Sequence, residues 1–333
     1  VENYFEAVRS YNKHKENGHD EIRPPNYKSK YLWRTIKWKN GNKAFEYKNN
    51  AITLKFSRKM ESVTIPLPEG ANMLMLPDGT KLNGTPIEVK VKAVYRKKEV
   101  SHLQLHVTWD YGIVPVSVNV KVSAYDINSA VVARTSTEGN RQLIMCGEIL
   151  SLVQYRNKVI AEFQSRMSKL KDGSKKMKKL SKAKGRILKK LERRINQLVN
   201  SLTKLMGVLD KEENISVSLL GDLTDLRRSA ETGDKNKVAS HKINQMPYSK
   251  IENQHSYKSL MKQIQSKKAN ERYSSQTCSR CGARNKEYRI ERGLWKCEEC
   301  GETIHADING NTNILKNYLF GRCDLGWLLR MNR

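Results

Sequence analysis

The sequence lacks any long hydrophobic run, and no apolar stretch approaches the roughly 20 residues that a membrane-spanning helix needs. It also lacks the charged and apolar regions of a secretory signal peptide. Only 38% of its residues are hydrophobic, and its mean hydropathy is -0.70. We therefore expect a cytoplasmic protein, without a membrane partner.

Acidic residues are also scarce, because 34 Asp and Glu oppose 62 Lys and Arg and leave a net charge of +28. Self-repulsion of this size destabilises a compact chain unless a polyanion neutralises it, so we favour a nucleic acid as the partner. A basic surface that serves solubility, or one that binds an anionic membrane, is the alternative. The sequence shows no amphipathic anchor or lipidation motif for the latter. Binding to nucleic acid should weaken with salt.

Cysteine is rare as well, yet four of the six cysteines form two CxxC pairs. They are Cys278, Cys281, Cys297 and Cys300, and a glycine follows each pair. This spacing is typical of a tetrahedral zinc ribbon with a structural metal. Two disulfides or scattered core thiols are the alternatives. Cys146 and Cys323 lie far apart in the sequence, which fits a reducing cytosol.

The N-terminal third has a helical start and then a β pattern. Residues 1–30 combine a short helix with a basic, proline-rich segment that is suited to phosphate contacts and stacking, or serves as a linker. Its candidate binding residues are Arg23, Tyr27, Lys28 and Lys30. Alternating apolar residues and Asn-Gly or Asp-Gly turns across residues 31–115 predict an antiparallel β-barrel or sandwich, of which we favour the barrel.

A second β region begins near Val116 and predicts a three-strand meander. Asp126 lies near the end of its first strand, as in the ribonuclease H type of fold, where such a carboxylate faces a metal ion. A further strand, Ile215–Leu220, is followed by Gly221 and Asp222, and Asp307 begins the final helix. We expect residues 116–277 and 305–333 to form this domain, with the zinc ribbon inserted at residues 278–304.

A long helical insert is predicted for residues 150–210. Leucine and isoleucine recur at steps of three and four from Leu188 to Leu205, and Asp172-Gly173-Ser174 divides the insert into two helices. A run of lysine and arginine precedes the leucines. We interpret it as an ordered basic hairpin that grips nucleic-acid backbone; a solvated face or a disordered tail is the alternative. Its candidate contacts are Arg166, Lys169, Lys171, Lys175, Lys176, Lys178, Lys179, Lys182, Lys184 and Arg186.

The order of these motifs resembles the TnpB family of transposon-encoded, RNA-guided nucleases, which are relatives of type V CRISPR effectors. The resemblance rests on Tyr125-Asp126-Ile127-Asn128, the basic insert, Gly221-Asp222-Leu223, the two CxxC pairs and Asp307-Ile308-Asn309. It implies an α+β multidomain fold with a wedge-like barrel, a RuvC nuclease domain of the ribonuclease H type, and an inserted zinc ribbon. Most of the family's N-terminal recognition helices would be missing.

The resemblance also implies the active site. Asp126 corresponds to the first RuvC acid and Asp307 to the last. Relatives often carry a glutamate where this chain has Gly221. We expect Glu271 to replace it. Asp222 is the alternative, although its side chain should point to the other face of the sheet. Loss of the middle acid is the third possibility.

The implied activity is RNA-guided, magnesium-dependent cleavage of double-stranded DNA beside a short adjacent motif, in a prokaryotic, nucleoid-associated protein. The guide RNA would come from the transposon end, and zinc and magnesium would be the two metals. A nuclease-dead repressor that binds DNA through a guide is the first alternative. A transposase or a generic zinc-ribbon nucleic-acid binder is the second.

Overall fold

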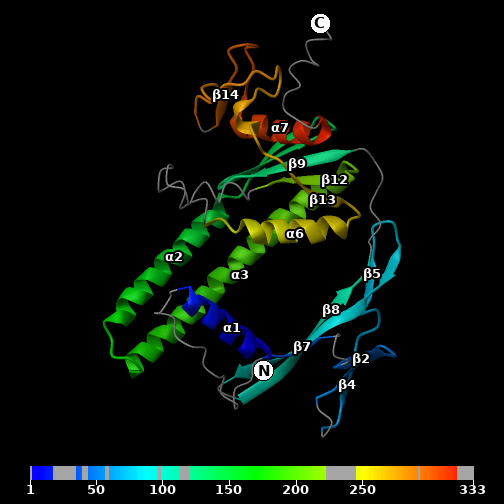
Figure 1. Ribbon diagram of the computed structural model, residues 1–333, viewed down its shortest axis with the longest axis vertical. Helices are drawn as coiled ribbons and strands as arrows, with labels where there is room; N and C mark the ends of the chain where they lie inside the picture. Colours follow the sequence, from blue (N-terminus) through cyan, green and yellow to red (C-terminus); the bar gives the residue numbers. More distant parts are fainter. Residues whose placement is uncertain are drawn as a thin grey trace. The chain divides into compact units, whose positions relative to one another are not determined.

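The computed structural model describes residues 2–17, 35–39, 44–56, 60–96, 99–112, 121–222, 245–291 and 293–320 (Figure 1). The chain forms two compact units, Val1–Met75 with Gly79–Ile113, and Leu76–Asp78 with Val114–Arg333. The candidate contacts Arg23, Tyr27, Lys28 and Lys30 lie outside the described residues, as does Cys323.

In its described residues, the first unit contains α1 (Glu2–Glu16) and eight strands in three antiparallel sheets. The strands β1 (Thr35–Lys39), β7 (Thr85–Arg96) and β8 (Glu99–Asp110) form one sheet, and β2 (Phe45–Lys48), β3 (Ala51–Leu54) and β4 (Val63–Pro66) form the second. The third is the hairpin of β5 (Met73–Met75) and β6 (Lys81–Asn83).

The predicted barrel is wrong for the described residues, because these sheets stay open. Closure would require hydrogen bonds between edge strands. The edge strand β4 instead ends at Pro66, which has no backbone N–H to donate. The core of the unit joins the two three-stranded sheets, where Trp38 and Val89 of one pack with Ile52 of the other.

The second unit is built on a five-stranded sheet with the order β11-β10-β9-β12-β13. The antiparallel meander of β9 (Val122–Ile127), β10 (Val131–Ser136) and β11 (Arg141–Met145) is present as predicted. The strands β12 (Val217–Gly221) and β13 (Gln265–Ala269) then add in parallel to β9. Both β9 and β12 therefore end at the same edge of the sheet.

Helices cover both faces of this sheet. Alternation along β9 sends Tyr125 and Ile127 into a core with α2 (Gly147–Ser168), α3 (Lys175–Glu212) and α6 (Tyr248–Leu260). It sends Val122 and Ala124 to the opposite face, where they pack against α7 (Ala306–Phe320). We call these the α3 face and the α7 face. Asp126 has the same parity as Val122 and so belongs to the α7 face.

A small cysteine-rich lobe joins β13 to α7. It contains the 3-10 helix η2 (Ser274–Gln276) and the hairpin of β14 (Leu294–Lys296) and β15 (Thr303–His305). Trp295 and Tyr288 form its core with Cys278 and Cys297. No helix in the described ranges has the length and apolar character needed to span a membrane.

A candidate active site on the alpha7 face of the sheet

Asp126 lies on β9 near the point where α7 crosses the sheet. Its Oδ2 atom accepts a hydrogen bond from Asn128 Nδ2 at 3.3 Å. The same oxygen lies 3.9 Å from where a Cβ on Gly310 of α7 would stand. Burial, together with the nearby charge of Asp307, raises the pKa of Asp126 to about 6.

Asp307 occupies the first turn of α7, where the helix dipole favours an acidic side chain. Its side chain is 14% exposed, and its Oδ1 atom lies 3.4 Å from the guanidinium Nη2 of Arg289. Its backbone N–H donates to His305 Nδ1 at 3.3 Å. Sequence reasoning missed Arg289, because it lies between the two cysteine pairs in a stretch without a recognisable motif.

Glu271 fills the space beside Gly221 at the end of β12. A Cβ built on Gly221 would stand 1.7 Å from Glu271 Oε1, so no larger residue fits at position 221 while Glu271 keeps this position. Burial, together with the charges of Asp126 and Asp222, raises the pKa of Glu271 to about 8. The Oε1 atom is buried and has no hydrogen-bond partner among the described residues.

Asp222 has the opposite parity to Gly221 along the strand. Its Oδ1 atom lies 3.9 Å from Lys268 Nζ, on a side chain that is 43% exposed. Gly221 shares its parity with Leu219, which packs against α7. The structure therefore brings Glu271, and not Asp222, into the place on the α7 face that a glutamate at position 221 would occupy.

Three buried asparagines of α7 fix these acids relative to one another. Asn311 Nδ2 donates to the carbonyl of Ala124, two residues before Asp126, at 2.8 Å. Asn309 and Asn313 donate to the carbonyl of Thr277 at 2.8 and 2.6 Å. The segment that follows Glu271 and the strand that carries Asp126 are thus both attached to the helix of Asp307.

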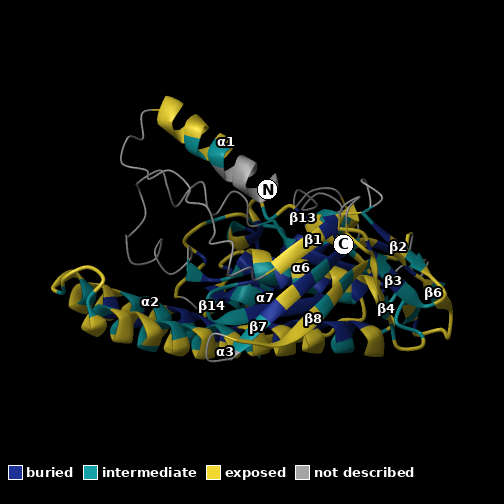
Figure 2. Cartoon of the chain, turned by 90° about the horizontal axis from the view of Figure 1, so that it is seen from below, coloured by how far each residue is buried: buried dark blue, intermediate teal, exposed yellow. Residues whose placement is uncertain are grey.

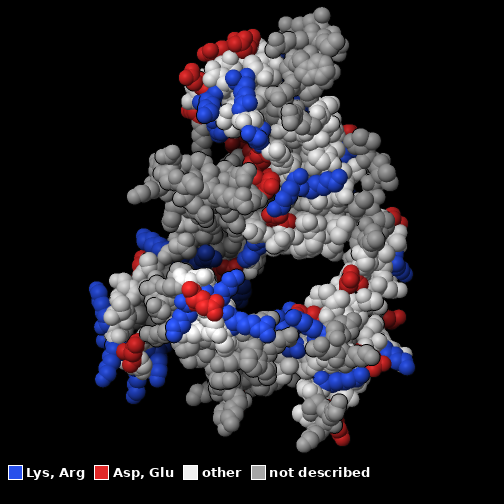
Figure 3. All heavy atoms as spheres, in the orientation of Figure 1, with Lys and Arg blue, Asp and Glu red and all other residues white. Residues whose placement is uncertain are grey.

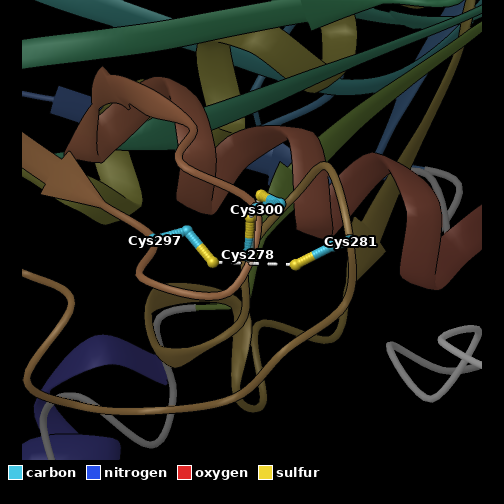
Figure 4. Close-up of side chains that lie close together, drawn as sticks. All are labelled: Cys278, Cys281, Cys297 and Cys300. Atoms are coloured by element: carbon cyan, nitrogen blue, oxygen red, sulfur yellow. Dashed lines mark hydrogen bonds between the residues drawn. The ribbon is translucent and has the colours of Figure 1, made fainter.

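The four cysteines form the tighter of the two clusters. Cys278 Sγ lies 3.7 Å from Cys300 Sγ, and Cys281 Sγ lies 3.6 Å from Cys297 Sγ (Figure 4). All four sulfur atoms lie within 4.8 Å of one another. Four thiols at this separation fit the tetrahedral coordination of zinc, so the cluster could hold that ion.

The carboxylates are more widely spaced than the thiols. Among the described His, Cys, Asp and Glu residues, the four cysteines are the set of three or more whose ligand atoms all lie within 4.8 Å of one another. The charge of Asp307 raises the pKa of Asp126, and the charge of Asp126 raises the pKa of Glu271, but the carboxylate oxygens do not form such a compact set.

The basic residues predicted to bind nucleic acid surround the turn between α2 and α3. We call residues 166–186 the hairpin tip. Of the ten candidates there, Lys184 is partly buried and the other nine are exposed. Figure 3 shows Lys and Arg side chains projecting from this end of the hairpin, which Figure 1 places far from the sheet.

Comparison with known proteins agrees with this architecture. Residues 248–314, which include Glu271, the cysteines and Asp307, match the family described as Cas12f1-like, TNB domain. No curated protein sequence matches the chain.

Among solved structures, the chain is similar to one in a cryo-EM structure of a Cas12f1–sgRNA–target DNA complex. The TM-score is 0.58 and the identity 16%, over 93% of this chain and 70% of that one. A CRISPR-Cas12f ternary complex gives a TM-score of 0.45 and 16% identity, over 90% of this chain and 66% of the other. The first likeness shows a mixed α/β fold that resembles the fold of Cas12 effectors.

Proposed function

We propose that this protein is an RNA-guided endonuclease that hydrolyses the phosphodiester bonds of double-stranded DNA with magnesium. One observation carries the proposal: Asp126, Glu271 and Asp307 share one face of the sheet. Burial, together with the charge of a neighbouring carboxylate, raises the pKa values of Asp126 and Glu271. The Cas12f1-like match over residues 248–314 and the likeness to the guided complex support it.

The residues present fit magnesium. Carboxylate oxygens are the hard ligands that this ion prefers, and Glu271 Oε1 is a buried oxygen without a partner. Asp126, Glu271 and Asp307 would hold the ion or ions. The chemistry that magnesium supplies in such a site is activation of water and neutralisation of charge on the scissile phosphate.

The side chains of this chain would orient the reacting groups. Arg289 contacts Asp307 and also lowers the pKa of Asp126 by its charge. When the carboxylates bind metal, this guanidinium would be available for a phosphate oxygen. Asn128 Nδ2 donates to one oxygen of Asp126 and so would help to orient this carboxylate.

The remaining parts would bind and place the nucleic acids. The hairpin tip supplies cations for a phosphate backbone. The cysteine lobe would hold a structural zinc and so fix the path of the chain from Glu271 to Asp307. We propose that residues 31–115 act as the wedge and that residues 116–277 with 305–333 form a RuvC domain, as in TnpB, with a guide RNA from the transposon end and an adjacent motif in the DNA.

The test is to purify the protein with its co-purifying RNA, to identify that RNA, and to challenge the complex with a plasmid library that carries the matching target. We expect cleavage that requires magnesium, the RNA and a short flanking motif. Target binding without cleavage would favour a guided repressor. Purification without any bound RNA would favour a transposase or a generic nucleic-acid binder.

A further inference from the structure

The hairpin tip is an ordered turn with a defined shape. Residues 169–174 connect α2 to α3, and Gly173 takes a φ of +75°, which glycine adopts without strain. Ser174 caps α3, because its hydroxyl accepts a hydrogen bond from the backbone N–H of Met177 at 3.2 Å. The two helix ends therefore present their side chains at fixed positions.

An open, shallow cavity of about 680 Å³ lies at this tip. Leu170, Leu180 and Ala183 supply its apolar lining, and six Lys and Arg side chains, among them Arg166 and Lys179, complete it. No acidic residue lines it. The volume falls in the range of ligand sites, about 300–1,000 Å³. Figure 2 shows that the residues at this end of the hairpin are mostly exposed.

The cations around the cavity have no internal counterions. None of the six forms an ion pair with a described residue; Arg166 instead lies over the ring of Phe163 at 5.8 Å. Closer to the sheet, the same two helices pair their charges, as Arg156 does with Glu192 at 3.1 Å. The tip thus keeps its positive charge for an anion from outside the chain.

A lining of three apolar residues and six cations fits a ligand that combines an uncharged, flat part with negative groups. A bare duplex offers phosphates but keeps its bases stacked and paired. An unpaired nucleotide offers both parts, since its base can lie on apolar side chains and guanidinium planes while the adjoining phosphates contact lysines. Loops and bulges of folded RNA commonly present bases in this way.

We propose that the cavity at the hairpin tip binds one unpaired nucleotide of a folded RNA. The base lies against Leu170, Leu180 and Ala183, and the flanking phosphates contact the surrounding lysines and arginines. The inference rests on RNA being a partner of the chain. The site would recognise the folded shape of the RNA, in addition to the base pairing between guide and target.

The experiment compares a short RNA hairpin that contains one bulged uridine with the same hairpin fully paired. Binding to the full chain that carries Asp307→Asn is measured without magnesium, so the result does not depend on cleavage. We expect about tenfold tighter binding of the bulged RNA, which is within the range for the stacking of one base. Ala183→Leu places a larger side chain where the base would lie and should abolish this preference.

Ser181→Leu is the matched control, because Ser181 is exposed on the same helix and does not line the cavity. It should keep the preference for the bulged RNA. Equal binding of both hairpins by the parent protein, or a preference that survives Ala183→Leu, would overturn the proposal. A bulged DNA hairpin that binds as tightly as the RNA would assign the site to a displaced DNA strand instead. Guided cleavage without a preference for the bulged RNA would overturn this proposal alone. A preference for the bulged RNA without guided cleavage would overturn the proposed function alone.

Discussion

The two faces of the central sheet differ in how buried charges are paired. On the α3 face, the fully buried Arg134 donates to Asp210 Oδ1 at 3.1 Å and to Glu213 Oε1 at 2.6 Å. The hydroxyl of Tyr125 also donates to Asp210, at 2.7 Å. On the α7 face, Asp126 and Glu271 gather without a cation at the centre, and Arg289 reaches Asp307 from the edge.

This difference indicates what each face is for. A buried ion pair with hydrogen bonds fixes the packing of α3 on the sheet, and losing one partner exposes the other to a large desolvation penalty. Carboxylates that raise one another's pKa values weaken the fold unless a cation joins them. On the α3 face the chain supplies its own counterion for buried charge, whereas on the α7 face the proposed function would assign that role to an added metal ion.

Zinc removal should have the largest effect on the α7 face. The cysteine lobe is continuous with Glu271 and α7, and structural zinc contributes about 10 kcal/mol or more to the folding of small zinc domains. We expect a zinc chelator, or Cys278→Ser, to unfold the lobe and abolish cleavage while the α3 face stays folded. Hydrogen exchange and the cleavage assay report the two outcomes. An unfolded lobe with normal cleavage would contradict the proposed placement of Glu271.

Neutralising the acids of the α7 face should separate activity from stability. Asp126→Asn and Asp307→Asn should each reduce cleavage more than about 100-fold. Loss of a residue that only orients a metal ligand costs about 10- to 100-fold, and loss of the ligand itself should cost more. Without magnesium, Asp126→Asn should unfold at the same or a higher temperature, because it removes an unmatched charge. A clear loss of thermal stability would show that Asp126 is structural.

Removing a charged side chain from the α3 face should instead destabilise the protein. Arg134→Met leaves Asp210 buried without its cation and should lower the free energy of unfolding by about 3–5 kcal/mol. Adding Asp210→Asn removes the stranded charge and should restore part of that loss. Chemical denaturation measures both variants. If Arg134→Met alone is as stable as the parent, the ion pair contributes little to stability.

Acid should destabilise the α3 face through His255. This buried imidazole contacts the hydroxyl of Ser218 at 3.0 Å and that of Ser266 at 3.3 Å, and burial lowers its pKa from 6.5 to about 4. The unfolded chain takes up a proton below pH 6.5, whereas the folded chain does so only near pH 4. Stability is therefore full above pH 6.5 and falls by about 3 kcal/mol as the pH drops towards 4.

Denaturation at a series of pH values tests this slope. His255→Gln should be less stable than the parent at pH 7, and its stability should fall less steeply between pH 6.5 and 4. Parallel curves for the two proteins would show that His255 does not titrate on unfolding.

The sequence predicts the ends of elements better than the contacts between them. The positions of Asp126 and Asp307 follow from strand and helix patterns, because those patterns fix which residues lie at an element's end. The pairing of Arg134 with Asp210 and the approach of Arg289 to Asp307 join residues that are far apart in the sequence, with no periodic signal to link them. The open sheets of the first unit were missed for a similar reason, since alternation shows which face is buried but not which edges pair.

Gly221 gives the most specific test of how the α7 face is assembled. Gly221→Ala places a methyl group 1.7 Å from the present position of Glu271 Oε1, so the carboxylate must move. We expect cleavage to fall about 10- to 100-fold, as when a group that orients a metal ligand is lost. Gly185→Ala is the matched control, because a Cβ there meets no atom within 4 Å and the helix should gain about 0.5–1 kcal/mol in stability.

If Glu271 replaces the glutamate expected at position 221, Gly221→Glu combined with Glu271→Gly should retain more activity than Glu271→Gly alone. Equal activity of those two variants would place the middle acid elsewhere.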